Sequence, residues 1–246
     1  SGRNSALTEE YNGTSWTEKN DLNTARRALG GVGIYTAALA LGGYSTTALA
    51  NVETWNGTNW TETTDLNTAR SYVGAAGTQT NALAVSGHDG SSNVGVAEVW
   101  NGSNWTEVAD LNTTRTYGAM GGTSTDAIYF GGYKPAGIEA NTESWDGSSW
   151  TEVNDLNTAR AQLAGAGDAS PSVLAFGGGP TSSGVANTES WNGASWVEVA
   201  DLATARYLLA GAGSSNTSAL AFGGYPKQNH TEEWSGSTTT IKVLSD

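Results

Sequence analysis

Few side chains in this sequence could catalyse a reaction. The chain has no cysteine, which excludes thiolate nucleophiles, thiolate metal ligands and disulfides. Its two histidines, His88 and His230, lie far apart in the sequence, and two imidazoles without a third ligand make a weak metal site. Glycoside hydrolysis requires one specific pair of carboxylates, whereas the carboxylates here recur at regular intervals. We therefore expect a protein that is not an enzyme and has no catalytic residue, metal or cofactor.

The arginines follow a regular pattern. The string D-L-x-T-x-R occurs five times, at intervals of 44 to 46 residues, and ends at Arg26, Arg70, Arg115, Arg160 and Arg206. These guanidinium groups could form a ring of positive charge. The alternative is a structural contact, either with the aspartate five residues earlier or with the glutamate of a second repeated string, E-x-W. Because arginine suits planar contacts with several donors and each copy carries its own acid, we expect the structural role.

The ten tryptophans also belong to a repeat. The string E-x-[WY]-x-G occurs six times, with its aromatic residue at Tyr11, Trp55, Trp100, Trp145, Trp191 and Trp234, and in the first five copies another tryptophan follows five residues later, at Trp16, Trp60, Trp105, Trp150 and Trp196. Ten exposed indoles would present about 2,000 Å² of aromatic surface, far beyond the apolar patch that a soluble monomer tolerates. We therefore expect a structural role, with the rings buried between repeats, for Trp55, Trp60, Trp100, Trp105, Trp145, Trp150, Trp191 and Trp196.

Each repeat is predicted to form four short β-strands. In the copy that covers residues 70–109, the expected strands are 71–76, 82–87, 97–100 and 105–108, and no segment shows apolar residues at helical spacing. An Asn-Gly pair between the last two strands is a strong hairpin signal. If Trp55 lies opposite Trp60, the two indoles share one face; if Asn56-Gly57 is itself the turn, Glu53 lies opposite Trp60 and the indoles still share that face. Stacking the next sheet against this face would bury it.

Four strands in about 45 residues, arranged radially, are typical of a β-propeller. The unit resembles the kelch repeat in three features: the arginine that opens the first strand, the glycine pair that ends the second strand, and the tryptophan of the fourth strand. The glycine pairs are Gly42-Gly43, Gly131-Gly132, Gly177-Gly178 and Gly223-Gly224, and the second repeat departs from the pattern with Ser86-Gly87. The nearly identical D-L-N-T-A-R copies are also similar to tandem arrays in tail-fibre and surface proteins of bacterial viruses.

The repeat gives the expected domain organisation. We predict an all-β, kelch-type propeller of four-stranded antiparallel blades as a single domain over residues 1–246. It consists of a half-repeat at residues 7–25 and repeats at 26–69, 70–114, 115–159, 160–205 and 206–246. The half-repeat and the last segment could each complete the fifth blade, so we expect five blades with one of them displaced. Six blades with one incomplete blade are the alternative.

Charge and hydropathy exclude several classes of partner. The chain has 11 Lys and Arg against 24 Asp and Glu, for a net charge of −13. A nucleic acid requires clustered positive charge to displace its counterions, so we expect no nucleic-acid partner. No apolar run approaches about 18 residues, so we expect no membrane insertion. The first ten residues lack the apolar core of a signal peptide.

Candidate binding residues lie in the loops that vary between repeats. The second-to-third-strand loops, at 44–50, 88–96, 133–140, 179–186 and 225–230, differ in length and content, while the fourth-to-first-strand loops are nearly constant. Since strands alternate in direction, both kinds of loop should leave the same face. Relaxed drift of surface loops is the alternative explanation of this variation. The candidate ligand-binding residues are Tyr44, His88, Asp89, Tyr133, Lys134, Tyr225, Lys227 and His230.

Two functions from different classes follow as expectations. The first is a non-enzymatic binding module that recognises a receptor or a glycan through variable loops on one face, at a virion or extracellular surface. The second is the role that the kelch resemblance implies, a protein-interaction scaffold within a larger assembly, with a cytoplasmic location as the alternative. The expected partner is therefore a protein or a glycan on one propeller face.

Overall fold

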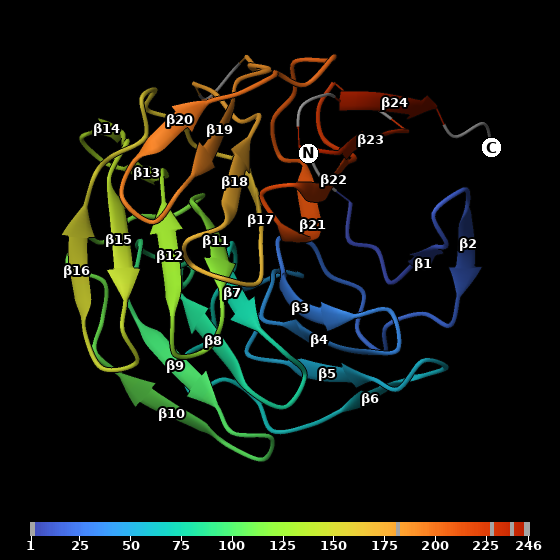
Figure 1. Ribbon diagram of the computed structural model, residues 1–246. Coiled ribbons are helices and arrows are strands. Elements are labelled where there is room, and N and C mark those ends of the chain that lie inside the picture. Colours follow the sequence, from blue (N-terminus) through green and yellow to red (C-terminus); the bar gives the residue numbers. More distant parts are fainter. Residues whose placement is uncertain (1–2, 181–182, 227–228, 237–238, 244–246) are drawn as a thin grey trace. The chain divides into compact units, whose positions relative to one another are not determined.

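The computed structural model describes residues 3–180, 183–226, 229–236 and 239–243 (Figure 1). These residues form strands and no helix. Five sheets of four antiparallel strands each make the fold a β-propeller of five blades, as predicted. The strands pair in sequence order within every blade, except that a small hairpin interrupts the third blade.

The strands of the five blades have the following bounds. Blade 1 contains β3 (Gly30–Ile34), β4 (Ala37–Leu41), β5 (Val52–Trp55) and β6 (Trp60–Glu62). Blade 2 contains β7 (Gly74–Gly77), β8 (Ala82–Val85), β9 (Ala97–Trp100) and β10 (Trp105–Val108). Blade 3 contains β11 (Ala119–Gly122), β12 (Ala127–Phe130), β15 (Thr142–Trp145) and β16 (Trp150–Val153). Blade 4 contains β17 (Ala164–Ala166), β18 (Val173–Phe176), β19 (Thr188–Trp191) and β20 (Trp196–Glu198), and blade 5 contains β21 (Ala210–Ser215), β22 (Ser218–Phe222), β23 (His230–Trp234) and β24 (Thr239–Val243).

Two hairpins stand outside the blades. The pair β1 (Thr8–Tyr11) and β2 (Trp16–Lys19) forms a two-stranded sheet from the predicted half-repeat. The pair β13 (Tyr133–Lys134) and β14 (Gly137–Ile138) lies in a second-to-third-strand loop. Because β23 and β24 complete blade 5, the N-terminal hairpin is the segment left outside the five blades.

The chain divides into two compact units, residues 1–114 and 115–246. Unit 1 holds the β1–β2 hairpin with blades 1 and 2, and unit 2 holds blades 3, 4 and 5. The division coincides with the predicted boundary between repeats 70–114 and 115–159. The prediction of one domain over residues 1–246 stays a prediction.

Packing explains the composition of the first and second strands of the blades. First strands of neighbouring blades approach closely: in unit 2, a Cβ atom on Gly165 would lie 2.5 Å from Met120 O, and one on Gly211 would lie 2.5 Å from Gly165 O. The glycines of the first strands therefore permit the blades to pack. The second strands β8, β12 and β18 lie in the middle of their sheets and are buried along their whole length, which explains why both of their faces are apolar.

The hairpin between the third and fourth strands adopts the first of the two predicted registers. Trp55 lies opposite Trp60, and Glu53 lies opposite Glu62, so the register that paired Glu53 with Trp60 is wrong. The reason is that Asn56-Gly57 is half of a four-residue loop: Asn56 Oδ1 accepts hydrogen bonds from the backbone N–H groups of Thr58 and Asn59, each at 2.9 Å. The ring centroids of the paired tryptophans lie 5.2–5.3 Å apart in blades 1 to 4.

The indole N–H groups join the sheets. The third-strand tryptophans of blades 1, 2, 3 and 5 donate to the turn between the first two strands of their own blade, as Trp100 does to Gln79 O at 3.0 Å. Two fourth-strand tryptophans donate to the preceding repeat of their own unit: Trp105 to Thr64 O at 3.2 Å and Trp196 to Thr142 Oγ1 at 3.0 Å. Seven of the eight tryptophans assigned a structural role are buried and Trp60 is half-buried; the buried ones are Trp55, Trp100, Trp105, Trp145, Trp150, Trp191 and Trp196.

Candidate functional site

Each repeat contains a buried ion pair. The repeated arginine contacts the glutamate of the E-x-W string in its own repeat and not the aspartate five residues earlier. The nitrogen–oxygen distances are 3.0 Å for Arg26–Glu53, 2.9 Å for Arg70–Glu98, and 2.8 Å for both Arg160–Glu189 and Arg206–Glu232; Arg115 pairs with Glu143 in the same way. All five guanidinium side chains are fully buried, so they do not form a charged ring open to an anion.

The glutamate of this pair also holds the fourth-to-first-strand loop. Glu98 Oε2 accepts hydrogen bonds from the backbone N–H of Asn67 at 2.7 Å and from its Nδ2 at 2.8 Å. The aspartate of the same loop makes a separate contact: Asp65 Oδ1 accepts the backbone N–H of Val52, the first residue of β5, at 3.3 Å. The constant D-L-N-T-A-R loop is therefore used in holding the scaffold together, which leaves the variable residues next to it as candidates for binding.

Burial changes the titration of these arginines. Removal from water lowers the pKa of Arg26, Arg70, Arg160 and Arg206 from the ordinary value, because desolvation disfavours the charged form. The neighbouring glutamate opposes this shift in each case. Because arginine is the most basic of the side chains, the guanidinium remains charged near neutral pH.

The residue after each repeat arginine pairs with the residue after each glycine pair. We call these five contacts the variable pairs: Arg27–Tyr44, Ser71–His88, Thr116–Tyr133, Ala161–Gly179 and Tyr207–Tyr225. They are backbone bridges at the same end of every blade, yet their side chains differ in each repeat. The guanidinium of Arg27 lies 4.4 Å from the ring centroid of Tyr44, and the rings of Tyr207 and Tyr225 lie 5.2 Å apart. The five blades thus carry different pairs of side chains at the same backbone position.

The next residue of each repeat has an unusual backbone conformation. Six non-glycine residues in the described part of the chain have a positive φ, and five of them occupy this one repeat position. We call it the left-handed position; its residues are Ala28 (φ 54°), Tyr72 (56°), Tyr117 (60°), Gln162 (58°) and Leu208 (54°). The sixth is Ser86, which stands where other repeats carry the first glycine of the pair.

Backbone hydrogen bonds link successive left-handed positions. In unit 1, Tyr72 N donates to Ala28 O at 2.7 Å. In unit 2, Gln162 N donates to Tyr117 O and Leu208 N donates to Gln162 O, both at 2.8 Å. Since bonded residues are immediate neighbours, the variable side chains of Tyr117, Gln162 and Leu208 form one row within unit 2.

Four of the predicted ligand-binding residues occupy one equivalent position. Tyr44, His88, Tyr133 and Tyr225 are the members of the variable pairs that follow the glycines. His88 Nδ1 accepts the backbone N–H of Gly90 at 3.0 Å, which leaves Nε2 to carry the proton in the neutral ring.

The remaining predicted binding residues have other roles or placements. Asp89 Oδ1 accepts the backbone N–H groups of Ser91 and Ser92 at 2.7 and 2.8 Å, and these bonds lower its pKa to about 2. Lys134 forms a 3.1 Å ion pair with Glu139. His230 is the first residue of β23, so it belongs to a strand and not to the loop in which it was predicted. Lys227 lies outside the described residues.

The sequence alone did not identify the residues that pair with the predicted binding residues. The variable-pair members Arg27, Ser71, Thr116, Ala161 and Tyr207, and all five left-handed positions, follow the constant arginine and were assigned to the first strand. The signal that could have found them is the difference between repeats: in copies that otherwise agree, the dipeptide after the arginine differs in every copy, although Tyr72 and Tyr117 are the same residue type. Gln162 Oε1 is buried and accepts no hydrogen bond from any described residue, so it is an unsatisfied acceptor next to the variable pairs.

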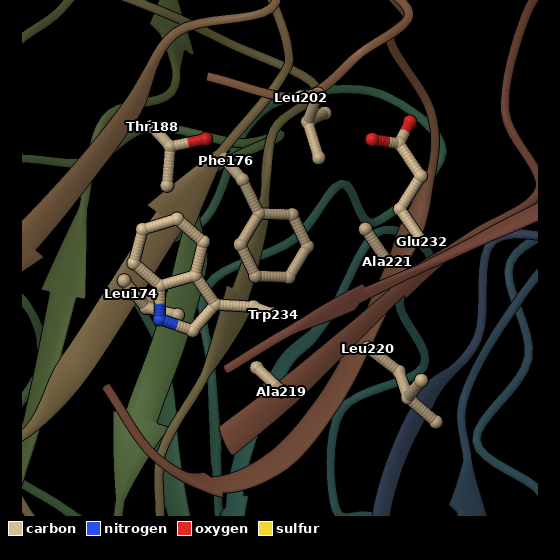
Figure 2. A pocket seen from close by; sticks show the side chains of 9 residues that line it. All are labelled: Leu174, Phe176, Thr188, Leu202, Ala219, Leu220, Ala221, Glu232 and Trp234. Carbon is tan, nitrogen blue, oxygen red and sulfur yellow. The ribbon is translucent and has the colours of Figure 1, made fainter. Parts of the chain in front are cut away.

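Blade 5 differs from the others in its packing. A small cavity of about 10 Å³ lies between blades 4 and 5 and is lined by Leu174, Phe176, Thr188, Leu202, Ala219, Leu220, Ala221, Glu232 and Trp234 (Figure 2). In the preceding interface the equivalent residues contact a tryptophan: Phe130 lies 4.8 Å from Trp196 between ring centroids, and Trp196 Nε1 donates to Thr142. In blade 5 the residue opposite Trp234 is Thr239, so the second tryptophan is missing.

Within the described residues, no group of three or more His, Asp or Glu side chains could hold a metal ion. No helix long and apolar enough to cross a membrane occurs in that part of the chain.

Comparison with known proteins gives a likeness of fold. No protein-family model matches the chain, and no curated protein matches it. The solved structure of YjhT is similar, with a TM-score of 0.78 and 12% sequence identity; the alignment covers 98% of this chain and 93% of YjhT. At this identity the likeness shows the fold alone.

Proposed function

We propose that this protein is a non-enzymatic binding module, and that within a unit its ligand contacts the variable pairs and the left-handed positions. The observation that carries the proposal is the side chain at the left-handed position. Many turns in the described chain place glycine where φ is positive, but this position has a side chain in all five repeats.

Retaining these side chains has an energetic cost. For L-residues the left-handed conformation costs roughly 1–2 kcal/mol, and glycine avoids this strain. Strain of this kind persists where the surrounding structure imposes it, and it is concentrated at functional sites. Five equivalent strained positions that carry four different side-chain types are expected of a recognition surface, whereas a purely structural position could use glycine.

The side chains present favour a receptor or glycan as ligand. The row in unit 2 offers an aromatic ring at Tyr117, an acceptor at Gln162 that no described residue pairs, and an apolar side chain at Leu208, all uncharged. Aromatic rings pack against the apolar faces of sugars, and amide oxygens accept hydrogen bonds from hydroxyl groups. The protein would act at a virion or extracellular surface, in line with the similarity of its repeats to those of surface proteins of bacterial viruses.

A glycan array and a cell-binding assay test this proposal. The wild-type protein is expected to bind at least one glycan or one cell type. A variant with Tyr117→Gly and Gln162→Gly is expected to lose at least tenfold in affinity while its thermal unfolding remains cooperative. As a matched control, Val197→Ala changes an exposed strand residue away from the variable pairs and should bind like the wild type. If the array and the cell assay both show no binding, the receptor or glycan function is wrong.

A protein-interaction scaffold of kelch type is the second candidate. Leu208 is 51% exposed and Tyr225 is 53% exposed, and both lie on the loop end of blade 5. Large apolar side chains of this kind favour a protein partner, since aromatic residues are enriched in protein interfaces. A stoichiometric protein partner in a pull-down from the native source, lost on Leu208→Gly, would support the scaffold role over the first function.

A further inference from the structure

The N-terminal hairpin has the structure of half a blade. Its register places Tyr11 opposite Trp16, with ring centroids 5.2 Å apart, as in the tryptophan pairs of blades 1 to 4. It packs on blade 1 as one blade packs on the next, because Trp60 Nε1 donates to Thr8 Oγ1 at 2.9 Å, just as Trp196 donates to Thr142. Strands β1 and β2 are therefore equivalent to the third and fourth strands of a blade.

Among the described residues, no strand pairs with the inner side of this hairpin. Every third strand in the five blades pairs with a second strand on one side and a fourth strand on the other, whereas β1 pairs with β2 alone. Glu9 occupies the repeat position of the buried glutamates, but it is exposed and pairs with no arginine of the described residues. The hairpin thus presents an open strand edge and a carboxylate suited to a buried guanidinium.

The outer half of blade 5 lacks part of the repeat pattern. Strands β23 and β24 carry Thr239 in place of the second tryptophan, and the cavity between blades 4 and 5 lies beside Phe176 and Thr188, the residues that such a tryptophan would contact. The inner half is intact: β22 carries the regular pattern, and Arg206 requires a carboxylate, which Glu232 supplies at 2.8 Å.

We propose that the β1–β2 hairpin of one copy of this chain replaces β23–β24 at strand β22 of a second copy. In the exchanged state Glu9 takes the place of Glu232 beside Arg206, Tyr11 takes the place of Trp234, and Trp16 supplies the indole that blade 5 lacks at Thr239. The exchange keeps the backbone register, because both hairpins carry the string T-E-E followed by an aromatic residue. It pairs the open edge of β1, places an indole beside the cavity, and releases the β23–β24 hairpin from β22.

This contact is heterologous, since a hairpin from the start of one chain meets the last blade of the next. Such contacts produce rings if the rotation closes and open chains if it does not. The proposed interface is independent of the proposed ligand site, because it uses strand edges and not the variable pairs.

Disulfide trapping tests the exchange directly, because the chain contains no cysteine of its own. Strand β22 places Leu220 opposite Glu233, and the proposed register places Leu220 opposite Glu10 of the second copy. The variant Glu10→Cys/Leu220→Cys is expected to form disulfide-linked dimers and larger species under mild oxidation, with a yield that rises with protein concentration. A failure to crosslink between chains, or a crosslink within one chain only, would overturn the proposal.

A matched variant separates exchange from misfolding. Leu220→Cys/Glu233→Cys closes a disulfide inside blade 5, which holds β23 on β22. This variant is expected to remain monomeric by light scattering at concentrations where the wild type assembles. Thr239→Trp restores the repeat pattern in β24 and should also reduce assembly. Equal assembly of the wild type and the locked variant would contradict the exchange.

Discussion

The guanidinium of Arg70 lies 2.9 Å from the carboxylate of Glu98, and both side chains are completely buried. Glu98 also accepts two hydrogen bonds from Asn67, so one carboxylate fixes both the arginine and the loop that connects blades 1 and 2. The ion pair recurs in all five repeats, which makes it the unit from which the scaffold is assembled.

Glu98→Gln is expected to lower the free energy of unfolding by about 3–5 kcal/mol, because it leaves a buried guanidinium without a counter-charge. Urea denaturation measures this change. The matched control is Glu139→Gln, which breaks the partly exposed pair with Lys134 and should change the stability by at most about 1 kcal/mol. A loss of less than about 1 kcal/mol for Glu98→Gln would contradict the structural role of the pair.

Trp105→Ala is expected to destabilise the fold by about 3–5 kcal/mol, because it removes a buried indole together with its hydrogen bond to Thr64. Val197→Ala, at a half-exposed strand position, should change the stability by about 0.5 kcal/mol or less. Thermal unfolding of the two variants gives the comparison. If Trp105→Ala weakened ligand binding and left the melting temperature unchanged, the indoles would be binding residues.

Gln162→Gly is expected to be more stable than Gln162→Ala, by up to about 1 kcal/mol. At most positions the order is reversed, because glycine loses more chain entropy on folding; here the φ of 58° strains every residue with a Cβ. Chemical denaturation of both variants measures the difference. An alanine variant clearly more stable than the glycine variant would show that this position is not strained.

Asp146→Asn is expected to remove one acid-dependent contribution to stability. Asp146 accepts hydrogen bonds from Ser148 and Ser149, and these bonds lower its pKa from the ordinary 3.8 to about 2. Because the folded state favours the ionised form, the contribution is complete above about pH 4 and is lost as the pH falls toward 2. Asparagine makes the same backbone contacts in other repeats, as Asn56 does, so the variant should fold.

The measurement is the melting temperature of the wild type and Asp146→Asn between about pH 2 and pH 6. The other carboxylates titrate in both proteins and cancel in the difference. The advantage of the wild type should shrink below about pH 4. A difference that stays constant across this range would mean that the turn does not bind the ionised aspartate preferentially.

The parts of the fold that the repeat determines were predictable from sequence. The period of about 45 residues and the E-x-W string predicted four-stranded blades, because the same local pattern returns in each copy. The choice between two acids for each arginine stayed open, since both lie at constant spacing. Only the folded contacts show that Arg70 pairs with Glu98, while Asp65 accepts the backbone N–H of Val52 at the start of β5.

The candidate site was predictable only in part. The residues after the glycine pairs, such as Tyr44 and His88, stood out because their loops vary in length. Residues such as Tyr72 and Gln162 did not, because their left-handed backbone and their hydrogen bonds to the neighbouring repeat exist only in the folded chain. A short stretch of sequence does not reveal either feature.

The most direct test of the proposed binding surface is a variant with glycine at all five left-handed positions: Ala28→Gly, Tyr72→Gly, Tyr117→Gly, Gln162→Gly and Leu208→Gly. Its affinity should be measured for whichever array glycan or cell surface the wild type binds. We predict a protein at least as thermally stable as its alanine counterpart that has lost binding by tenfold or more. Binding equal to that of the wild type would contradict the assignment of these positions to the ligand site.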